Sequence, residues 1–246
     1  MLLAVDIGNS NATFGLFDKE WKDTWRIDSK DEAQEQLNNL LNDHLHGLPV
    51  KEIVISSVVP FFTRIIQEQL AFKFKVDPYL ITPESFEKLP LSVPEPSRIG
   101  SDLVADAVGA WERFNSDCMV VDFGTALTFT VISDEKILGV NIAPGLKVAM
   151  KALASNAARL SEIPLELPDS VIGTNTTTAI QSGILWGYVG LVERMIDRIN
   201  DELGVGLKVV ATGGLSKVLE PLHERFDAVD ANLTLEGMRH IYRMNQ

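Results

Sequence analysis

The sequence predicts an α/β fold of two related halves, each a mixed five-stranded sheet flanked by helices, with a cleft between the halves. A strand, a small polar turn and a second strand occupy residues 2–17, and the same succession returns at residues 119–134. In both stretches an aspartate ends the first strand, Asp6 and Asp122, and a glycine follows two residues later. After each hairpin, strand and helix patterns alternate, which is typical of the α/β class.

Hydrophobic periodicity predicts the elements of the first half. They are strands at residues 2–7, 12–17 and 19–28, a helix at 31–45, a strand at 51–59, a helix opened by Pro60 and a strand at 79–81. Three antiparallel strands followed by α/β units form the first half of a ribonuclease-H-like domain. Four prolines within residues 83–98 predict a connecting loop, and a helix then starts at Ser101 or Asp102.

The second half repeats this outline. After the hairpin at residues 119–134 we expect strands at 136–142, 207–212 and 226–229, and helices at 145–158, 178–199, after 216 and at 233–243. With Asp6 laid on Asp122, Gly8 falls on Gly124 and Leu16 on Ile132. These repeats predict two ribonuclease-H-like domains, residues 1–115 and 116–246.

Charge and cysteine content restrict the possible partners and the kinds of site. A net charge of −12 and a pI near 4.8 argue against nucleic acid or an anionic membrane as a partner, because either would be repelled. The single cysteine, Cys118, lies in an apolar strand and favours core packing over a disulfide framework or a multi-cysteine zinc site. No signal peptide is evident and no apolar run approaches the ~20 residues of a membrane span, so we expect a cytoplasmic protein.

The two turns indicate phosphate chemistry. The Asp6 carboxylate can hold a hydrated Mg²⁺, while Gly8 lets the N–H groups of residues 8–11 approach phosphate oxygens. A plain β-turn is the alternative for one copy, and the second copy favours nucleotide binding. Gly213 and Gly214 end a strand and permit close approach of an adenine or ribose; a strand-end turn is the alternative.

Asp102 has two interpretations. As a first-turn acid it would stabilise its helix through the dipole by about 0.3–1 kcal/mol. Beside a phosphate site it would act as a general base that deprotonates a substrate hydroxyl. Asp106, one turn later, is the competing candidate.

Motifs along nearly the whole chain resemble the type III pantothenate kinase family, within the acetate kinase, sugar kinase, heat-shock chaperone and actin superfamily. They are Asp6-Ile-Gly-Asn-Ser10, Ile55-Ser-Ser-Val-Val-Pro60, Gly100-Ser-Asp102, Asp122-Phe-Gly-Thr125, Ala143-Pro-Gly145, Ile172-Gly-Thr-Asn-Thr176, Thr212-Gly-Gly-Leu215 and Leu233-Thr-Leu-Glu-Gly237. The resemblance implies ATP-dependent phosphorylation of the primary hydroxyl of pantothenate to 4′-phosphopantothenate, the first step of coenzyme A synthesis, by a homodimer.

The resemblance also implies site residues. ATP would contact Asp6, Ile7, Gly8, Asn9, Ser10, Asn11, Ala12, Thr13, Thr125, Gly213 and Gly214. Asp6 would help to place Mg²⁺, Asp122 would match a monovalent-cation site for K⁺ or NH₄⁺, and Asp102 would accept the proton. The pantothenate pocket would comprise Val93, Gly100, Ser101, Asp102, Leu103 and Thr176.

Departures from the family pattern concern mainly the acid substrate. Leu103 stands where the family has arginine and Val93 where it has tyrosine, so an anionic substrate loses a charge-assisted partner of roughly 1.5–3 kcal/mol. Arg98 is the nearby candidate for the missing charge. Two alternatives follow: a kinase for a less anionic hydroxyl substrate, and an inactive nucleotide-binding accessory or regulatory paralogue.

Overall fold

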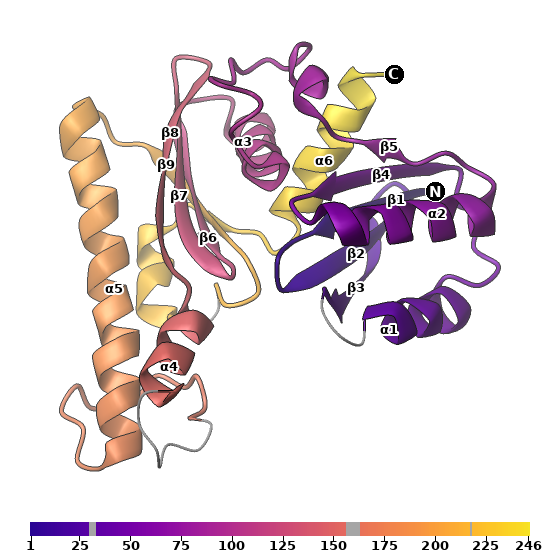
Figure 1. Cartoon of the computed structure of the whole chain (residues 1–246). Coiled ribbons are helices and arrows are strands. Elements are labelled where there is room, and N and C mark those ends of the chain that lie inside the picture. Colours follow the sequence, from indigo (N-terminus) through magenta and orange to yellow (C-terminus); the bar gives the residue numbers. More distant parts are fainter. Residues whose placement is uncertain (30–32, 156–162, 217) are drawn as a thin grey trace. The chain divides into compact units, whose positions relative to one another are not determined.

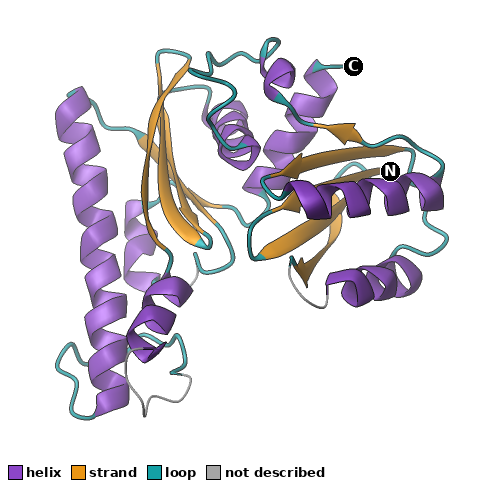
Figure 2. Cartoon of the chain, in the orientation of Figure 1, coloured by secondary structure: helices purple, strands orange, loops and turns teal. Residues whose placement is uncertain are grey.

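The chain folds around two five-stranded sheets, each with its own helices (Figures 1 and 2). The computed structural model describes residues 1–29, 33–155, 163–216 and 218–246. Two compact units result: residues 1–113 with 135–137 and 232–246, and residues 114–134 with 138–231. The division of the sequence into two domains, residues 1–115 and 116–246, stays a prediction. The compact units differ from them in grouping the C-terminal segment with the first sheet.

The first unit holds the sheet that carries Asp6. Its strands are β1 (Leu2–Ile7), β2 (Asn11–Phe17), β3 (Trp21–Asp28), β4 (Glu52–Ser57) and β5 (Tyr79–Leu80), in the order β3-β2-β1-β4-β5. Its helices are α1 (Ala33–Asn39), the π-turn η1 (Leu40–His44), α2 (Pro60–Phe74), the 3₁₀ turn η2 (Pro83–Phe86), α3 (Ser101–Phe114) and α6 (Leu233–Met244). The first three strands pair antiparallel and the last two join in parallel, as predicted.

Helices cover both faces of this sheet. Leu3, Val5 and Ile7 of β1 pack with α1 and α2 in one buried cluster. Alternation along a strand turns Asp6 to the opposite face. On that face α6 contacts β1 and β4. The strand therefore buries one face in an apolar core and presents its terminal carboxylate on the other.

The second unit repeats the arrangement around Asp122. Its strands are β6 (Cys118–Phe123), β7 (Ala126–Ser133), β8 (Lys136–Pro144), β9 (Lys208–Thr212) and β10 (Ala228–Val229), in the order β10-β9-β6-β7-β8. Its helices are α4 (Leu146–Ser155), α5 (Thr176–Leu203) and the 3₁₀ turn η3 (Glu220–Arg225). Two mixed five-stranded sheets confirm the predicted fold class.

Two predicted helices of this unit differ from the observed ones. The helix expected after Ser216 is replaced by the short η3, whose second residue is Pro221, a residue without an N–H for a helical hydrogen bond. The helix expected at 145–158 is α4, described up to Ser155, and its predicted end lies outside the described residues. The corresponding part of the first unit behaves similarly: the predicted helix 31–45 is α1 followed by η1, and residue 31 lies outside the described part.

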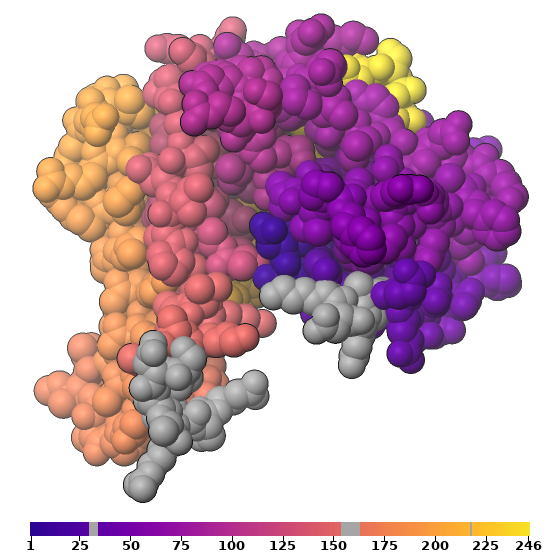
Figure 3. All heavy atoms as spheres, in the orientation of Figure 1, coloured from indigo at the N-terminus to yellow at the C-terminus, as the bar shows by residue number. Residues whose placement is uncertain are grey.

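One face of the second sheet packs against its helices. Met119, Val121 and Phe123 of β6 share a buried cluster with α4, α5 and η3. The outer side of α5, coloured orange, forms part of this unit's surface (Figure 3). Cys118 is fully buried, and burial, aided by the Asp117 charge, raises the pKa of its thiol to about 12, which suits core packing. No helix within the described ranges is both long and apolar enough to cross a bilayer.

The duplicated hairpins match with one offset. Strands β1 and β6 align residue for residue, Asp6 on Asp122. However, Asp6 pairs with Thr13, whereas Asp122 pairs with Thr128. The second turn is therefore one residue shorter, and every later position shifts by one. Leu16 thus corresponds to Val131, and the predicted match to Ile132 was wrong.

Helices α3 and α6 approach each other closely through glycine. A β-carbon added to Gly237 would lie 1.7 Å from the Ala105 carbonyl oxygen, and one added to Gly109 would lie 2.7 Å from the Leu233 oxygen. The Thr234 hydroxyl also donates to Asp106 across 2.6 Å. This contact fixes α3, whose first turn carries Asp102, against α6.

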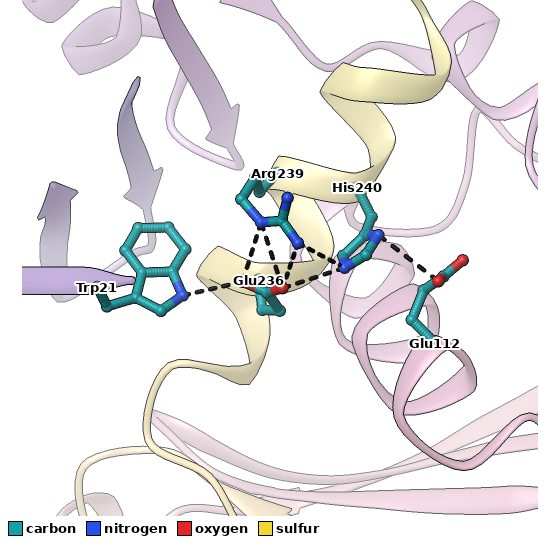
Figure 4. A network of polar contacts seen from close by, with 5 residues as sticks. All are labelled: Trp21, Glu112, Glu236, Arg239 and His240. Atoms are coloured by element: carbon teal, nitrogen blue, oxygen red, sulfur yellow. Dashed lines mark hydrogen bonds and ion pairs between the residues drawn. The ribbon is translucent and has the colours of Figure 1, made fainter. Parts of the chain in front are cut away.

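A polar network on α6 reinforces that contact (Figure 4). Glu236 accepts hydrogen bonds from Trp21 Nε1 at 2.9 Å and from the Arg239 guanidinium, and lies 3.1 Å from His240 Nε2. His240 Nδ1 is 3.6 Å from the Glu112 carboxylate of α3. Burial of Glu236 raises its pKa, but the hydrogen bonds of His240, Arg239 and Trp21 together outweigh burial and lower the pKa to about 2.

The Glu236 network predicts acid sensitivity of the first unit. A carboxylate whose folded-state pKa is depressed contributes stability above its unfolded pKa and loses it as pH falls. We expect the free energy of unfolding to fall from about pH 4.5 toward pH 2. Denaturant unfolding across this range measures the effect, and Glu236→Gln, which has no charge to titrate, should flatten the curve there. An equally steep curve for the variant would contradict this assignment.

Candidate active site

The first carboxylate is held by a chain of hydroxyls. Asp6 ends β1 and Ser56 lies beside it on β4 in parallel register. The Ser56 hydroxyl donates to Asp6 Oδ1 across 3.1 Å and lies 3.0 Å from the Ser101 hydroxyl. Ser101 is the first residue of α3 and Asp102 follows it. The structure therefore joins the end of β1 to the start of α3.

The first turn lies between β1 and β2. The Gly8 N–H donates to the Asn11 carbonyl across 3.0 Å. This hydrogen bond closes the turn, so the Gly8 amide, which we expected to face phosphate, is engaged within the protein. The other residues predicted to contact ATP line the same segment: Ile7, Asn9, Ser10, Asn11, Ala12 and Thr13.

Asp102 has the properties of a proton acceptor. Its side chain is half-buried, and burial raises the pKa of its carboxyl above the usual value, although the Leu103 N–H, 2.9 Å from Oδ1, lowers it. A β-carbon on Gly100 would lie 2.3 Å from Asp102 Oδ1. The carboxylate thus folds back over Gly100, which explains the glycine of the Gly100-Ser-Asp102 motif.

Gly100→Ala therefore tests the placement of this carboxylate. The added methyl group should displace the Asp102 side chain and lower the rate of any reaction that uses it by roughly ten- to a hundredfold, because small misplacements of a reacting group are costly. Thermal unfolding should change little, since the clash involves a side-chain end. Gly139→Ala on β8, where a β-carbon meets nothing within 4 Å, is the control. Equal rates for the two variants would show that this placement is unimportant.

Asp106 has an internal role. It is 2% exposed and accepts the hydrogen bond of Thr234 from α6. Its carboxylate therefore helps to dock α3 on α6. The geometry favours Asp102 over Asp106 as the acid that meets a substrate.

The second carboxylate, Asp122, lies against two glycine turns of its own unit. Gly213 has φ +88°, and a β-carbon there would lie 2.3 Å from Asp122 Oδ1 and 2.7 Å from the Phe123 backbone. Gly145 donates its N–H to the Thr125 carbonyl across 3.1 Å. The contacts of Gly213 explain why glycine stands there: it forms the strand-end turn that the sequence analysis gave as the alternative to a nucleoside contact. The hydrogen bond of Gly145 places Thr125 beside the Ala143-Pro-Gly145 turn.

Hydroxyl groups surround Asp122 on its sheet. Thr128 of β7 and Thr212 of β9 are its register partners on either side. Directly paired residues project from the same face, so the three side chains form one row. Thr128 Oγ1 and Thr130 Oγ1 are buried without a hydrogen-bond partner among the described residues. An unpaired buried hydroxyl costs about 1–3 kcal/mol, which a bound ligand beside Asp122 would offset.

The residues expected to bind the acid substrate come from three segments of the chain. Leu103 is half-buried in the first turn of α3, and Val93 follows Ser92, whose backbone hydrogen bonds with residues 135 and 137 anchor the loop. Arg98 is 78% exposed and forms an ion pair with Glu95. Thr176 is exposed at the start of α5, where Asn175 and Thr178 form the capping box and its own hydroxyl is not the cap. Gly214, which was predicted to contact ATP, lies in the turn after β9.

Sequence reasoning missed Ser56, Thr128 and Thr212 as site residues. The signal for Ser56 lay in the Ile55-Ser-Ser-Val-Val-Pro60 motif, which had no role assigned. Thr212 begins the Thr212-Gly-Gly-Leu215 motif. Both are the parallel-strand neighbours of the two aspartates, a relation that only strand pairing reveals.

The duplicated mixed sheets make the chain an α/β protein of two similar sheet units. One solved structure of similar fold is the activator of the 2-hydroxyisocaproyl-CoA dehydratase from Clostridium difficile with bound ADPNP. It has a TM-score of 0.53 and 12% identity, and the match covers 99% of this chain and 94% of that one.

Sequence comparison identifies the family. The family model described as type III pantothenate kinase matches residues 2–198. The type III pantothenate kinase of Citrifermentans bemidjiense is 36% identical over 100% of both chains. That of Thermomicrobium roseum is 41% identical over 98% of this chain and 96% of its own. The chain belongs to the type III pantothenate kinase family, which confirms the predicted resemblance.

Proposed function

We propose that this protein phosphorylates the primary hydroxyl of pantothenate with ATP, giving 4′-phosphopantothenate and ADP, the first step of coenzyme A synthesis. The family membership supports the reaction. The observation that carries its chemistry is the half-buried Asp102 carboxylate, whose pKa is raised and whose helix is joined to Asp6 through Ser101 and Ser56.

The residues suit an in-line phosphoryl transfer. Asp102 would accept the proton of the substrate hydroxyl while that oxygen bonds to the γ-phosphorus and the bond to the ADP oxygen breaks. Because such a transition state demands little from a base until late, positioning and charge neutralisation supply most of the acceleration. A raised pKa suits Asp102 to this role, since a carboxylate of higher pKa is a stronger base for the hydroxyl proton.

Mg²⁺ and the ATP phosphates would be held at the first turn. Mg²⁺ usually keeps several waters and binds one or two carboxylates together with substrate phosphates. Asp6 offers one carboxylate at the end of β1, and in the described ranges no group of three or more metal-ligating residues forms a dedicated protein cage. This donor set fits Mg²⁺ that arrives with ATP. The ADPNP in the Clostridium difficile activator, an ATP analogue on a similar fold, supports the nucleotide.

K⁺ or NH₄⁺ would bind beside Asp122. The carboxylate supplies charge, and the unpartnered Thr128 hydroxyl supplies an oxygen that a cation would satisfy. A cation there would also reduce the repulsion between ATP and a protein of net charge −12.

Thr128→Val tests this cation site. The variant keeps the shape of the side chain and removes an oxygen without a protein partner, so we expect unchanged or higher thermal stability. The K⁺ concentration for half-maximal activity should rise roughly tenfold or more, as when support for a bound metal is lost. Thr130→Val is the matched control, because it removes the other unpartnered hydroxyl, two residues further along β7. The same K⁺ requirement in both variants would contradict a site at Asp122 and Thr128.

A second candidate is a kinase for a less anionic hydroxyl compound. Leu103 replaces the arginine expected next to the base, and Arg98, the predicted substitute, is exposed and paired with Glu95. Both observations weaken the case for a cation from these two positions that would pair with the pantothenate carboxylate. A nucleotide-binding accessory protein without turnover is the remaining alternative.

We further propose a homodimer that works in the cytoplasm, where ATP is available. Exposed apolar residues on the second unit support self-association, namely Leu138, Ile142, Val148, Leu153, Val171 and Ile172. Light scattering coupled to size-exclusion chromatography measures the assembly directly.

The experiment that tests the reaction is a coupled assay of ADP release with pantothenate, followed by mass spectrometry of the product. We expect release that depends on pantothenate, Mg²⁺ and K⁺. Release with a different hydroxyl acceptor, and none with pantothenate, would establish the second candidate. Mg-ATP binding by calorimetry without turnover on any acceptor would establish the accessory role.

A further inference from the structure

Ser56 is a polar residue at a place where strands carry apolar ones. It is 0% exposed, and its neighbours on β4, Val54 and Ile55, are fully buried hydrophobic residues. A buried hydroxyl is retained at low cost only when its hydrogen bonds are made. Both partners of Ser56 are residues of the candidate active site, Asp6 and Ser101.

The direction of these hydrogen bonds follows from the number of protons. A serine hydroxyl has one hydrogen to donate. The Ser56 hydrogen goes to the acceptor-only Asp6 carboxylate, 3.1 Å away. The 3.0 Å contact must then use the Ser101 hydrogen, so Ser101 donates to Ser56. The chain of hydrogen bonds therefore runs from the first residue of α3 to the carboxylate at the end of β1.

We propose that Ser56 is a positioning residue, which holds the Asp6 carboxylate and the first turn of α3 in one arrangement. The proposal rests on the proposed function, because it assigns Asp6 to the Mg²⁺ and phosphate side and Asp102 to the proton. Asp102 follows Ser101 directly, so the hydrogen bond at Ser101 also sets where the base lies. Ser56 touches neither substrate and acts through both acids.

The second sheet has a hydroxyl residue at the equivalent place. Thr212, 1% exposed, is the parallel-strand neighbour of Asp122 just as Ser56 is of Asp6. On the antiparallel side the two acids have Thr13 and Thr128. Each acid therefore stands in a row between two hydroxyl residues. The same type of residue thus recurs on the strand parallel to each acid-bearing strand, which supports a role for it beyond core packing.

The test compares Ser56→Ala with Ser57→Ala. The Ser57 hydroxyl, one residue along β4, accepts hydrogen bonds from the Val59 N–H and from the Thr63 hydroxyl at the start of α2. The control thus removes a hydroxyl with two hydrogen bonds from the same strand. Ser56→Thr is the conservative variant, since Thr212 shows that threonine fits this place in the other sheet.

For Ser56→Ala we expect kcat to fall roughly ten- to a hundredfold, the loss of a hydrogen bond to a charged group, and the half-maximal Mg²⁺ concentration to rise. The KM for pantothenate should change less. Ser57→Ala should lower the melting temperature and leave kcat unchanged. Ser56→Thr should recover most of the kcat that Ser56→Ala loses. If Ser56→Ala is not folded by circular dichroism, Ser101→Ala breaks the same chain at its other end and should show the same Mg²⁺ shift.

Two outcomes overturn different claims. If the wild-type protein phosphorylates pantothenate and Ser56→Ala matches Ser57→Ala in kcat and Mg²⁺ requirement, Ser56 is structural and the positioning role is wrong. If the wild-type protein does not use pantothenate, the proposed function fails. The positioning role of Ser56 is then tested separately, by calorimetry of Mg-ATP binding to wild type and Ser56→Ala. Equal affinity in wild type and Ser56→Ala would then overturn the positioning role as well.

Discussion

Asp102→Asn is expected to lower kcat for pantothenate phosphorylation by about a hundredfold or more, because a positioned general base contributes some 10²–10⁴-fold. The substitution keeps the shape of the side chain and removes its basicity. Steady-state kinetics with ADP detection measure it. Asp106→Asn, one turn along α3, is the matched control: the amide oxygen can still accept from Thr234, so kcat should be kept. The reverse pattern would assign the base to Asp106.

The pH dependence of kcat/KM is a second test of the role of Asp102. A base acts only when ionised, so activity falls as pH drops through its pKa. Because burial raises the pKa of Asp102, the acidic limb of kcat/KM should lie above pH 3.8, the ordinary value for aspartate. An acidic limb at or below that value would show that burial does not tune the acid that limits the rate.

Gly237→Ala is expected to have the largest effect on stability. The new β-carbon would lie 1.7 Å from the Ala105 carbonyl oxygen and 2.5 Å from its carbon, and backbone atoms cannot turn aside as a side-chain end can. We expect the free energy of unfolding to fall by about 3 kcal/mol, the upper part of the usual range for overpacking. Urea unfolding measures the change.

Gly190→Ala on α5 is the control for that substitution. A β-carbon there meets nothing within 4 Å, so alanine should stabilise the helix by about 0.4–1 kcal/mol. A loss of stability at Gly190 equal to that at Gly237 would mean that helix propensity, rather than the contact with α3, governs both positions.

The sequence predicted the two hairpins and their acids well, since alternation and turn residues are local properties. The offset between the repeats escaped prediction because a turn one residue shorter leaves the motif intact. It changes only the strand pairing: Asp6 pairs with the seventh residue after it, Thr13, and Asp122 pairs with the sixth, Thr128. The contacts of α6 with β1 and β4 are likewise not readable from the sequence. A helix pattern reports which residues are apolar, while its partner sheet depends on Gly237 and on contacts more than a hundred residues away.

The candidate site was predicted mainly through motifs. Spacing left Asp106 as a competitor of Asp102, and burial with the Thr234 hydrogen bond separates them. The approach of Gly213 to a nucleoside stays a prediction, and the structure adds a close contact with Asp122 that the sequence did not indicate. Ser56 could not be found from its neighbours in sequence, because its role depends on a parallel strand fifty residues away.

The grouping of α6 with the first sheet has a consequence for synthesis on the ribosome. Strands β1 to β5 emerge first, yet the helix that covers the Leu2 and Val54 side of their sheet emerges only after residues 138–231. During translation that apolar surface stays uncovered while the second sheet is made, and exposed surface of this kind is what chaperones bind. The first sheet to appear is therefore the last to be completed.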